Sequence, residues 1–341
     1  MSGANGPFPA VRARTPGHRA LFGLTGPRQI GPRRGAAMSQ SPQILLPVDG
    51  IDDHGPGVAF ATQEARRREA GIHVVHVVPP AFPGLPVTSD VGLDGEEMRL
   101  LGSAAVEHAT EAVREALDGA DLPVTGEVLH GRVVPTLVEA SRDVALIVLV
   151  RRHPRPTPVL SAMSVVHGVA ARGHCAVAVV PREWGADRAS APVVVGVEGA
   201  EESGEIVRAV LDRTREPDNV VELVHAWWYS DAFDNLAFAG EAGEEETRRQ
   251  RERLESELGP LLADFPHIDT PLVIVHARPA EALIAASEDA RALVVGRHHP
   301  RLPLGSHLGP VTRVVLRESA CPVIIEADVN LPAPGRHVAT G

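Results

Sequence analysis

The sequence contains no lysine, because all 33 of its basic residues are arginine. Since either side chain serves on a solvated surface, we interpret this absence as the coding bias of GC-rich DNA. Only two cysteines are present, Cys175 and Cys321, which are too few for a disulfide framework or a four-thiolate zinc site. Aromatic residues make up only 3% of the chain, so Val, Leu, Ile and Ala must fill the core. This composition favours strands covered on both faces, and the scarcity of thiols fits a cytoplasmic protein.

The chain also lacks long apolar runs, net positive charge and metal-binding motifs. No stretch approaches the ~20 apolar residues that span a bilayer, so we expect no membrane partner. The formal net charge of −11 argues against a nucleic-acid partner, because phosphate backbones bind basic surfaces. Neither His-Glu-x-x-His nor Cys-x-x-Cys occurs, and His298, His299 and His307 are close only in sequence. We therefore predict no metal site.

The first 40 residues differ in composition from the rest. They are basic, contain no Asp or Glu, and are rich in Gly and Pro. Such a segment cannot bury enough apolar surface to fold, so we predict a disordered extension over 1–40. A basic anchor for anionic surfaces is the alternative, and Met38 stands where a shorter chain would begin.

An internal repeat divides the remaining sequence, whose total length of 341 residues suits two domains. Residues 130–180 align without a gap onto 276–326, and fifteen of these 51 positions are identical. The front halves correspond as well, since Val48-Asp49-Gly50 faces Val197-Glu198-Gly199. After the extension, the expected segments are a first domain over 43–182, a linker over 183–190, a second domain over 191–328 and a disordered tail over 329–341.

Each repeat alternates short Val-rich runs with longer amphipathic stretches, which is the pattern of strands joined by crossover helices. The long stretch 241–262 carries Glu and Arg at three- and four-residue spacing, so we expect a helix with a mostly solvated face. Right-handed crossovers then predict an α/β fold of two doubly wound, five-stranded parallel-sheet domains in tandem. The predicted strands are 44–48, 73–78, 124–129, 146–150 and 176–180, followed by 193–197, 220–226, 272–275, 293–295 and 323–326.

The order of several short motifs resembles the universal stress protein family. These are the opening strand that ends in an acidic residue and Gly, the strand that ends in Val-His-Ala-Trp at 224–227, and the closing Cys-Pro-Val-Ile-Ile at 321–325. The resemblance covers both repeats and implies a fold like that of the adenine nucleotide alpha hydrolases. It also implies dimers formed through the last strand and, in some members, ATP at the strand ends. The two repeats would then form an internal pseudo-dimer, alone or within a homodimer.

Nucleotide-binding members of this family carry a loop after the fourth strand with Gly, two residues, Gly, nine residues and then Gly-Ser or Gly-Thr. Glycine there lets backbone N–H groups approach phosphates, and a helix N-terminus supports the charge. In the second repeat His299 replaces the second glycine, and Pro310, which lacks an N–H, replaces the hydroxyl residue. The resemblance therefore implies a degenerate site with the candidate residues Glu198, Gly199, Gly296, Arg297, Gly309, Val311 and Thr312.

The first repeat departs further from the family's loop. Val150, His153 and Met163 fill all three glycine positions, and we expect the bulky side chains to close the site sterically. Asp49 and Gly50 remain as the counterparts of Glu198 and Gly199. ATP or a related adenine nucleotide is therefore expected to bind weakly in the second repeat and not in the first, and no other cofactor is expected.

Both loops keep the pattern Arg-x-His-Pro-Arg, at 151–155 and 297–301. Arg151, Arg152 and Arg155 in one loop, and Arg297 and Arg301 in the other, could hold an anion by their side chains. The alternative is a solvated, Pro-stiffened loop that helps to pack the two repeats together.

Three other features receive structural interpretations. His76 and His225 end the second strands at matched positions, which favours a structural role over catalysis. Cys175 and Cys321 begin the fifth strands and are expected to be buried core residues that lie toward opposite ends of an antiparallel pairing. Residues 227–229, Trp-Trp-Tyr, are expected to cover the core or meet a partner, with stacking on a base as the alternative.

These observations predict a cytoplasmic stress-response protein that acts by binding and is not an enzyme. No Ser-His-Asp order, Walker loop or nucleophile elbow is present, so no catalytic residue is assigned. A ligand-free interaction scaffold is one alternative. Another is an ATP-dependent enzyme such as a pyrophosphatase of related topology, but neither 49–53 nor 198–200 offers the Ser-Gly-Gly-x-Asp-Ser pattern that it would need.

Overall fold

The computed structural model describes residues 42–50, 54–80, 95–151, 162–185, 188, 190–214, 220–229, 240–297 and 308–326. Both termini for which disorder was predicted, 1–40 and 329–341, lie outside this part. The two Arg-x-His-Pro-Arg loops also lie outside it, apart from Arg151 and Arg297. Below, repeat 1 denotes β1 to β5 and repeat 2 denotes β6 to β10.

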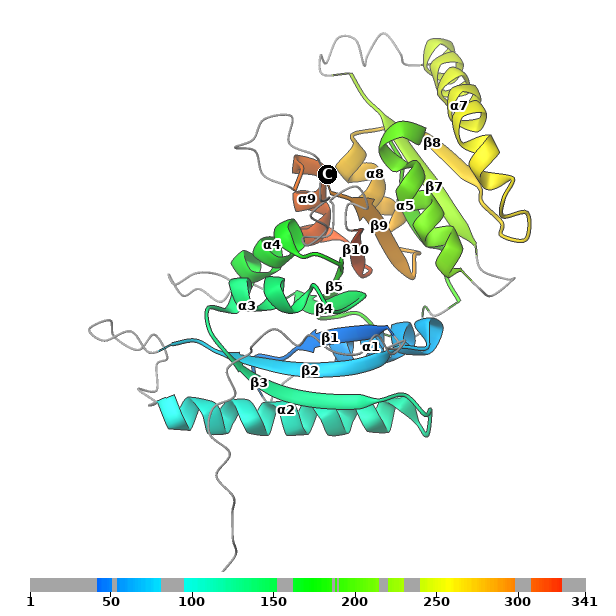
Figure 1. Ribbon diagram of the computed structural model, residues 1–341. Coiled ribbons are helices and arrows are strands. Elements are labelled where there is room, and N and C mark those ends of the chain that lie inside the picture. Colours follow the sequence, from blue (N-terminus) through cyan, green and yellow to red (C-terminus); the bar gives the residue numbers. More distant parts are fainter. Residues whose placement is uncertain are drawn as a thin grey trace, which may run out of the picture. The chain divides into compact units, whose positions relative to one another are not determined.

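Each repeat alternates strands with helices, as the sequence predicts (Figure 1). Repeat 1 contains β1 (Gln43–Pro47), α1 (Gly55–Arg68), β2 (Gly71–Val78), α2 (Gly95–Leu117), β3 (Val124–His130), α3 (Val133–Ala140), β4 (Leu146–Arg151), α4 (Ala162–Arg172) and β5 (Ala176–Pro181). Repeat 2 contains β6 (Val193–Gly196), α5 (Ala200–Arg213), β7 (Val221–Trp227), α7 (Glu241–Leu262), β8 (Leu272–His276), α8 (Pro279–Ala286), β9 (Ala292–Gly296), α9 (Pro310–Glu318) and β10 (Val323–Glu326).

The strands form one ten-stranded sheet in the order β3-β2-β1-β4-β5-β10-β9-β6-β7-β8. All neighbours are parallel except β5 and β10, which pair antiparallel with Ala178 opposite Ile324. The two halves of this order are related by a pseudo-twofold axis at the β5–β10 pair, so the last strands of the two repeats meet. The predicted doubly wound α/β fold is confirmed, and the two sheets are continuous.

Helices cover both faces of the sheet. One buried cluster, which includes Phe60, Val106, Val207 and Leu254, packs α1, α2, α5 and α7 against one face. A second cluster, which includes Leu137, Val169, Leu283 and Val315, packs α3, α4, α8 and α9 against the other. Each cluster contains residues of both repeats. The Val-rich strands are therefore covered on both sides, as the composition of the chain predicts.

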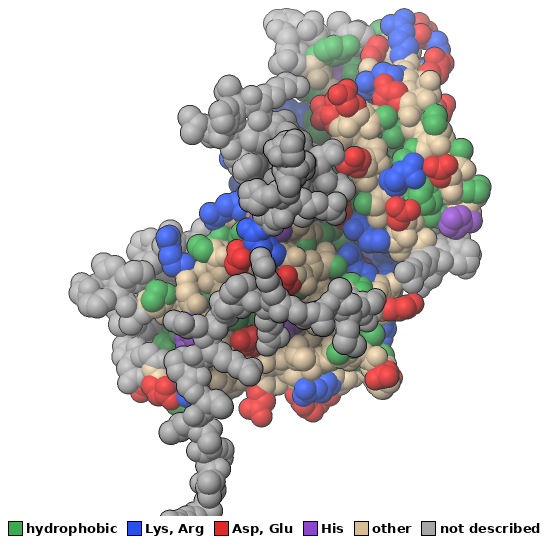
Figure 2. All heavy atoms as spheres, in the orientation of Figure 1, with side chains coloured by type: hydrophobic (Ala, Val, Ile, Leu, Met, Phe, Trp, Pro, Cys, Tyr) green, Lys and Arg blue, Asp and Glu red, His purple; other side chains and the backbone are tan. Residues whose placement is uncertain are grey.

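The helix α7 has the solvated face that its charge pattern predicts. Its buried residues are Gly243, Leu254 and Leu258, and its Glu and Arg side chains pair along the helix. Figure 2 shows basic and acidic side chains interspersed over the surface that α5 and α7 form. Such exposed pairs contribute little individually to stability.

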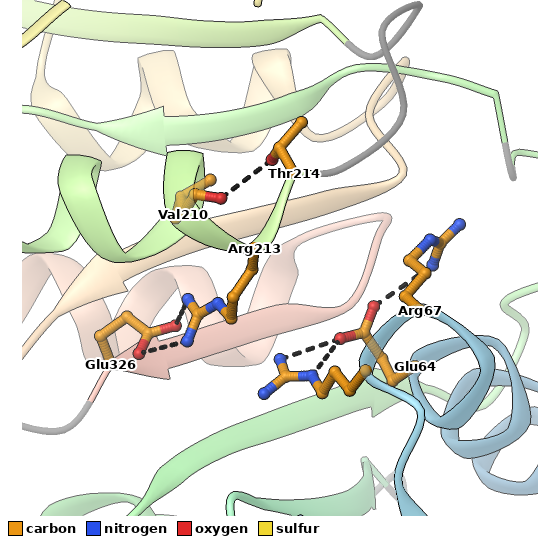
Figure 3. Close-up of polar contacts among 7 residues, drawn as sticks. Glu64, Arg67, Val210, Arg213, Thr214 and Glu326 are labelled. Carbon is orange, nitrogen blue, oxygen red and sulfur yellow. Dashed lines mark hydrogen bonds and ion pairs between the residues drawn. The ribbon is translucent and has the colours of Figure 1, made fainter. Parts of the chain in front are cut away.

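Buried carboxylates in each repeat are paired with arginines (Figure 3). Arg213 of α5 donates to both carboxylate oxygens of Glu326 in β10, with 3.3 Å between Nη1 and Oε2. Glu64 of α1 accepts from Arg67 and Arg68. Burial by itself would raise the pKa of Glu64, but the nearby guanidinium groups of Arg68, Arg67 and Arg291 outweigh burial and lower that pKa. Glu64 is therefore ionised, and its charge stabilises the fold at pH values above its ordinary pKa.

Within the stretch predicted as a linker, Trp184 packs against repeat 1. Trp184 is 6% exposed, and its ring meets Phe60 of α1 edge-on at 5.6 Å between ring centroids. The Trp184 backbone N–H donates to the Pro181 carbonyl oxygen at 3.1 Å, so the chain turns directly after β5. In the part of the chain that the structure describes, no helix is both long and apolar enough to cross a membrane.

Candidate functional site

The carboxyl ends of β6 and β9 form the switch point of repeat 2. These adjacent parallel strands lead into helices on opposite faces of the sheet, β6 into α5 and β9 toward α9. In doubly wound sheets, ligands bind in the crevice at such a point. Gly199 is the N-cap of α5 and Gly309 is the N-cap of α9, so two predicted site residues start the two helices that flank the switch point.

Two backbone N–H groups of the turn between β6 and α5 are bonded within the turn. The Glu198 N–H donates to Ser203 Oγ at 2.9 Å, and the Ser203 N–H donates to the Gly199 carbonyl oxygen at 2.9 Å. The Glu198 side chain is exposed. At the helix start, the Ala200 N–H donates to Glu257 Oε2 of α7 at 3.1 Å. A carboxylate therefore already neutralises the partial positive charge at this end of α5.

Gly199 lies close to the carboxylate groups of two glutamates. A Cβ at this position would lie 2.8 Å from Glu202 Oε2 and 3.4 Å from Glu257 Oε2. With Glu201 and Glu202 in the first turn, the N-terminus of α5 is surrounded by carboxylates. This environment opposes an anionic ligand at α5.

The N-terminus of α9 is different, because no acidic residue lies in its first turn. Gly309 is buried, and its carbonyl oxygen accepts from the Arg313 N–H at 3.1 Å. Pro310 occupies the first helical position and has no N–H. The backbone N–H groups of Val311 and Thr312 belong to the first turn, where the helix offers no acceptor. The Thr312 side chain is 6% exposed.

Gly296 at the end of β9 is packed against a helix. The Ile206 side chain of α5 lies where a Cβ on Gly296 would project. In repeat 1 the large residue is on the strand and the small residue is on the helix. Val150 stands at the position of Gly296, and Gly57 stands at that of Ile206. There, a Cβ on Gly57 would lie 2.8 Å from Val150 Cγ2. Val150 thus fills the space beside α1 that Ile206 fills beside β9.

In repeat 1, the turn after β1 carries Asp49 and Gly50 as predicted. Asp49 is exposed, and the Gly50 carbonyl oxygen accepts a 2.5 Å hydrogen bond from His54 Nε2. Residues 51–53 lie outside the described part, and so does the side chain of Met163. The expected steric closure of this site stays a prediction.

Two of the five arginines that could hold an anion have other partners. Arg151 donates to the carbonyl oxygens of Leu316 and Ser319, at 3.3 and 2.9 Å. Arg297 donates to those of Gly173 and Cys175, the latter at 3.1 Å. Each guanidinium group therefore crosses from one repeat to the other. This supports the packing alternative for these two side chains, while Arg152, Arg155 and Arg301 lie outside the described residues.

His76 and His225 lie two residues before the ends of β2 and β7 and have the structural role that was predicted. His76 Nδ1 donates to the Val48 carbonyl oxygen at 2.8 Å, and His225 Nδ1 donates to that of Val197 at 2.9 Å. Both bonds tie β2 or β7 to the residue after β1 or β6. Burial lowers the pKa of His225, so its imidazole is neutral at pH 7.

The cysteines and Trp227 are also placed as expected. Cys175 and Cys321 are buried free thiols, and the β5–β10 register puts them toward opposite ends of the pairing. Trp227 is 7% exposed, stacks on His276 at 3.9 Å between ring centroids, and donates from Nε1 to Thr247 Oγ1 at 3.2 Å. Trp228 is 41% exposed beside Arg278.

The described residues contain no group of three His, Cys, Asp or Glu side chains arranged to hold a metal ion. His298, His299 and His307 are not among them.

The sequence did not reveal the roles of Glu257 and Ser203 or the exchange of large and small residues at Gly57 and Ile206. The exchange could have been found by aligning the first helices of the repeats. The contact of Glu257 with Ala200 joins two residues 57 positions apart in the sequence, so it leaves no local pattern.

Comparisons with known proteins agree with this architecture. Residues 41–181 and 190–325 each match the family model described as the universal stress protein family. A universal stress protein of Mycobacterium tuberculosis is 32% identical over 312 residues, covering 85% of this chain and 96% of that protein. A second one from this organism is 28% identical over 290 residues, covering 83% and 96%.

Solved structures show the same fold. The chain is similar to a universal stress protein from Archaeoglobus fulgidus with a TM-score of 0.57 at 17% identity, covering 85% of this chain and 98% of that one. It is similar to a functionally unknown protein from Pseudomonas aeruginosa with a TM-score of 0.54 at 13% identity, covering 83% and 92%. At these identities the similarity concerns the fold alone.

Proposed function

Because the chain belongs to the universal stress protein family, we propose that it is a stress-response binding protein whose second repeat binds an adenine nucleotide weakly. The observation that carries this proposal is the N-terminus of α9. It combines Gly309 at the N-cap, two first-turn N–H groups without an acceptor in the helix, and a position after β9 at the switch point.

In this proposal the two sides of the switch point take different parts of the ligand. The phosphates face the N–H groups of Val311 and Thr312, because the α9 end has no carboxylate in its first turn. The adenine lies beside Glu198 and Gly199. Gly296 shapes the floor of the site through its contact with Ile206.

Three features make the binding weak. Pro310 removes one backbone donor from the phosphate side. The Ala200 N–H is held by Glu257, so the α5 end contributes no free donor there. Glu201 and Glu202 add negative charge nearby. In repeat 1, where Val150 and Met163 replace the first and third glycines, we propose that no nucleotide binds at Asp49 and Gly50.

The remaining parts of the proposal concern how the protein acts. We propose binding without turnover, since the described switch point offers no nucleophile paired with a base. The net charge of −11 disfavours nucleic acid as a partner, and buried free thiols suit the cytoplasm. The pseudo-dimer within one chain does not prevent whole chains from forming a homodimer.

A second candidate is a ligand-free interaction scaffold. The bond between Ala200 and Glu257 and the missing N–H at Pro310 favour it, because both reduce what a phosphate could contact. The two candidates differ only in whether repeat 2 is occupied, so one experiment separates them.

The experiment is calorimetric titration of the full chain with ATP. Pro310→Ser restores an N–H and adds a hydroxyl at the start of α9, and one added hydrogen bond to a charged ligand should raise the affinity about tenfold. Pro279→Ser is the matched control, because Pro279 opens α8 in the same way but α8 follows the edge strand β8 and not β9. It should leave the affinity unchanged.

Absence of heat with both the native chain and Pro310→Ser at ATP concentrations of about 1 mM would sink the nucleotide proposal and leave the scaffold. Inorganic phosphate, assayed in the same samples, should not accumulate. Release that scales with protein concentration would contradict binding without turnover.

A further inference from the structure

Arg151 and Arg297 form a reciprocal pair of contacts between the repeats. They occupy the same position, directly at or after the end of the fourth strand of each repeat. Arg151 donates to the Leu316 and Ser319 carbonyl oxygens at the end of α9. Arg297 donates to the Gly173 and Cys175 carbonyl oxygens just after α4. Each repeat thus supplies a cation to the carboxyl end of the other repeat's last helix.

This location has a clear physical effect. The last four carbonyl oxygens of a helix lack intrahelical partners and carry a partial negative charge. Leu316 lies within the last turn of α9, and Ser319 is the C-cap residue. The helix's own basic residue there, Arg317, instead pairs with Glu318. Arg151 is therefore the cation that contacts these carbonyls of α9 from repeat 1.

The end of α9 is also fixed to its own repeat. Ser287, at the end of α8, accepts from the Ala320 N–H at 2.9 Å. With Ser287 on one side and Arg151 on the other, the turn between α9 and β10 is held by both repeats. A helix of only nine residues is marginal by itself, so contacts at one end affect the order of the whole helix.

The opposite end of this same helix carries the N–H groups of Val311 and Thr312. We propose that Arg151 is a positioning residue for the nucleotide site of repeat 2, acting through α9, so that repeat 1 serves as the structural partner of a site that it does not itself contain. This inference rests on the proposed function. It also gives this arginine a role in a repeat whose own nucleotide loop lacks the first and third glycines.

The test replaces Arg151 in the full chain and measures two quantities. Arg151→Met removes the charge and the donors but keeps a long side chain, and Arg151→Lys keeps the charge. Arg172→Met is the matched control, because Arg172 also donates to a carbonyl oxygen, that of Gly168 in its own helix, without crossing to repeat 2. ATP affinity is measured by calorimetry, and amide hydrogen exchange is measured over 310–321.

Arg151→Met should weaken ATP binding about 3- to 10-fold, because fraying of α9 lowers the fraction of molecules with an ordered site. It should also speed exchange over 310–321. Arg151→Lys should recover part of both effects, and Arg172→Met should show neither.

Two results are distinguishable from each other. If the native chain binds ATP and Arg151→Met binds it equally well, the positioning role is wrong and the proposed function stands. If the native chain gives no binding, the proposed function fails and this inference fails with it. Faster exchange without any loss of affinity would assign Arg151 to stability alone and would also overturn the inference.

Discussion

At the scale of single residues, matched polar side chains hold equivalent places in the two repeats. His76 and His225 each donate to the carbonyl oxygen that follows a first strand. Ser141 and Ser287 accept from the backbone N–H groups of His174 and Ala320, at 2.7 and 2.9 Å. These contacts fix strand and helix ends independently of the ligand loops. The duplicated framework can therefore persist while the loops diverge.

The two thiols allow a prediction at this scale. Burial raises the pKa values of Cys175 and Cys321 from 9.0 to about 12. Near pH 8 the thiolate fraction is then lower by about a thousandfold than for an unperturbed thiol, and the thiolate is the reactive form. Alkylation of the native protein should be very slow, and both cysteines should react rapidly in urea.

Mass spectrometry of the alkylated chain checks this prediction, with the urea sample as the control. Rapid modification of either cysteine in the native protein would show that the β5–β10 region opens readily, contrary to the packing described above.

At the scale of elements, the first helix and the fourth strand of each repeat pack one large residue against one small residue. The large and the small residue change places between the two repeats. Ile206 of α5 fills the space over Gly296 of β9, whereas in repeat 1 Val150 of β4 fills the space over Gly57 of α1. A small residue on one element is matched by a large one on the other. The absence of a side chain at Gly296 therefore serves helix packing, whatever its role toward phosphate.

This exchange can be tested by transferring the repeat 1 pair into repeat 2. Gly296→Val should destabilise the chain by about 1–3 kcal/mol through overpacking, and Ile206→Gly should do so by about 3–5 kcal/mol through a cavity and helix flexibility. The double variant should be more stable than the sum predicts by at least about 1 kcal/mol. Urea unfolding gives these free energies.

The control combines Gly296→Val with Val113→Ala in α2 of repeat 1. These sites share no contact, so their effects should add within about 0.5 kcal/mol. Strict additivity for the Gly296 and Ile206 pair as well would contradict the proposed exchange.

Element types were predictable because the signals are periodic. Val-rich runs such as 146–150 and the charged stretch 241–262 become β4 and α7 with ends that differ by at most one residue. Contacts between distant elements were not predictable, since nothing local to Glu257 or Arg151 indicates a backbone group in another helix or repeat. For the candidate site, the sequence named Gly199 and Gly309, which the structure places at helix starts, but it missed the carboxylates around Gly199.

At the scale of the whole molecule, one sheet runs through both repeats. The antiparallel β5–β10 pair joins the two halves by backbone hydrogen bonds, and each hydrophobic cluster spans both repeats. The arginines Arg151 and Arg297 add contacts in both directions. The repeats are thus structurally interdependent but chemically unequal, since only repeat 2 keeps glycines at the end of the fourth strand and at the start of the last helix.

The central claim is that this unequal pair holds one weak nucleotide site per chain, at the start of α9. Nuclear magnetic resonance on isotope-labelled full chain titrated with ATP tests it most directly, because amide shifts report weak binding by position. The amide signals of Val311 and Thr312 should move with ATP, while those of the matched Val165 and Val166 in α4 should not. Equal movement in both helices, or no movement in either, would contradict the claim.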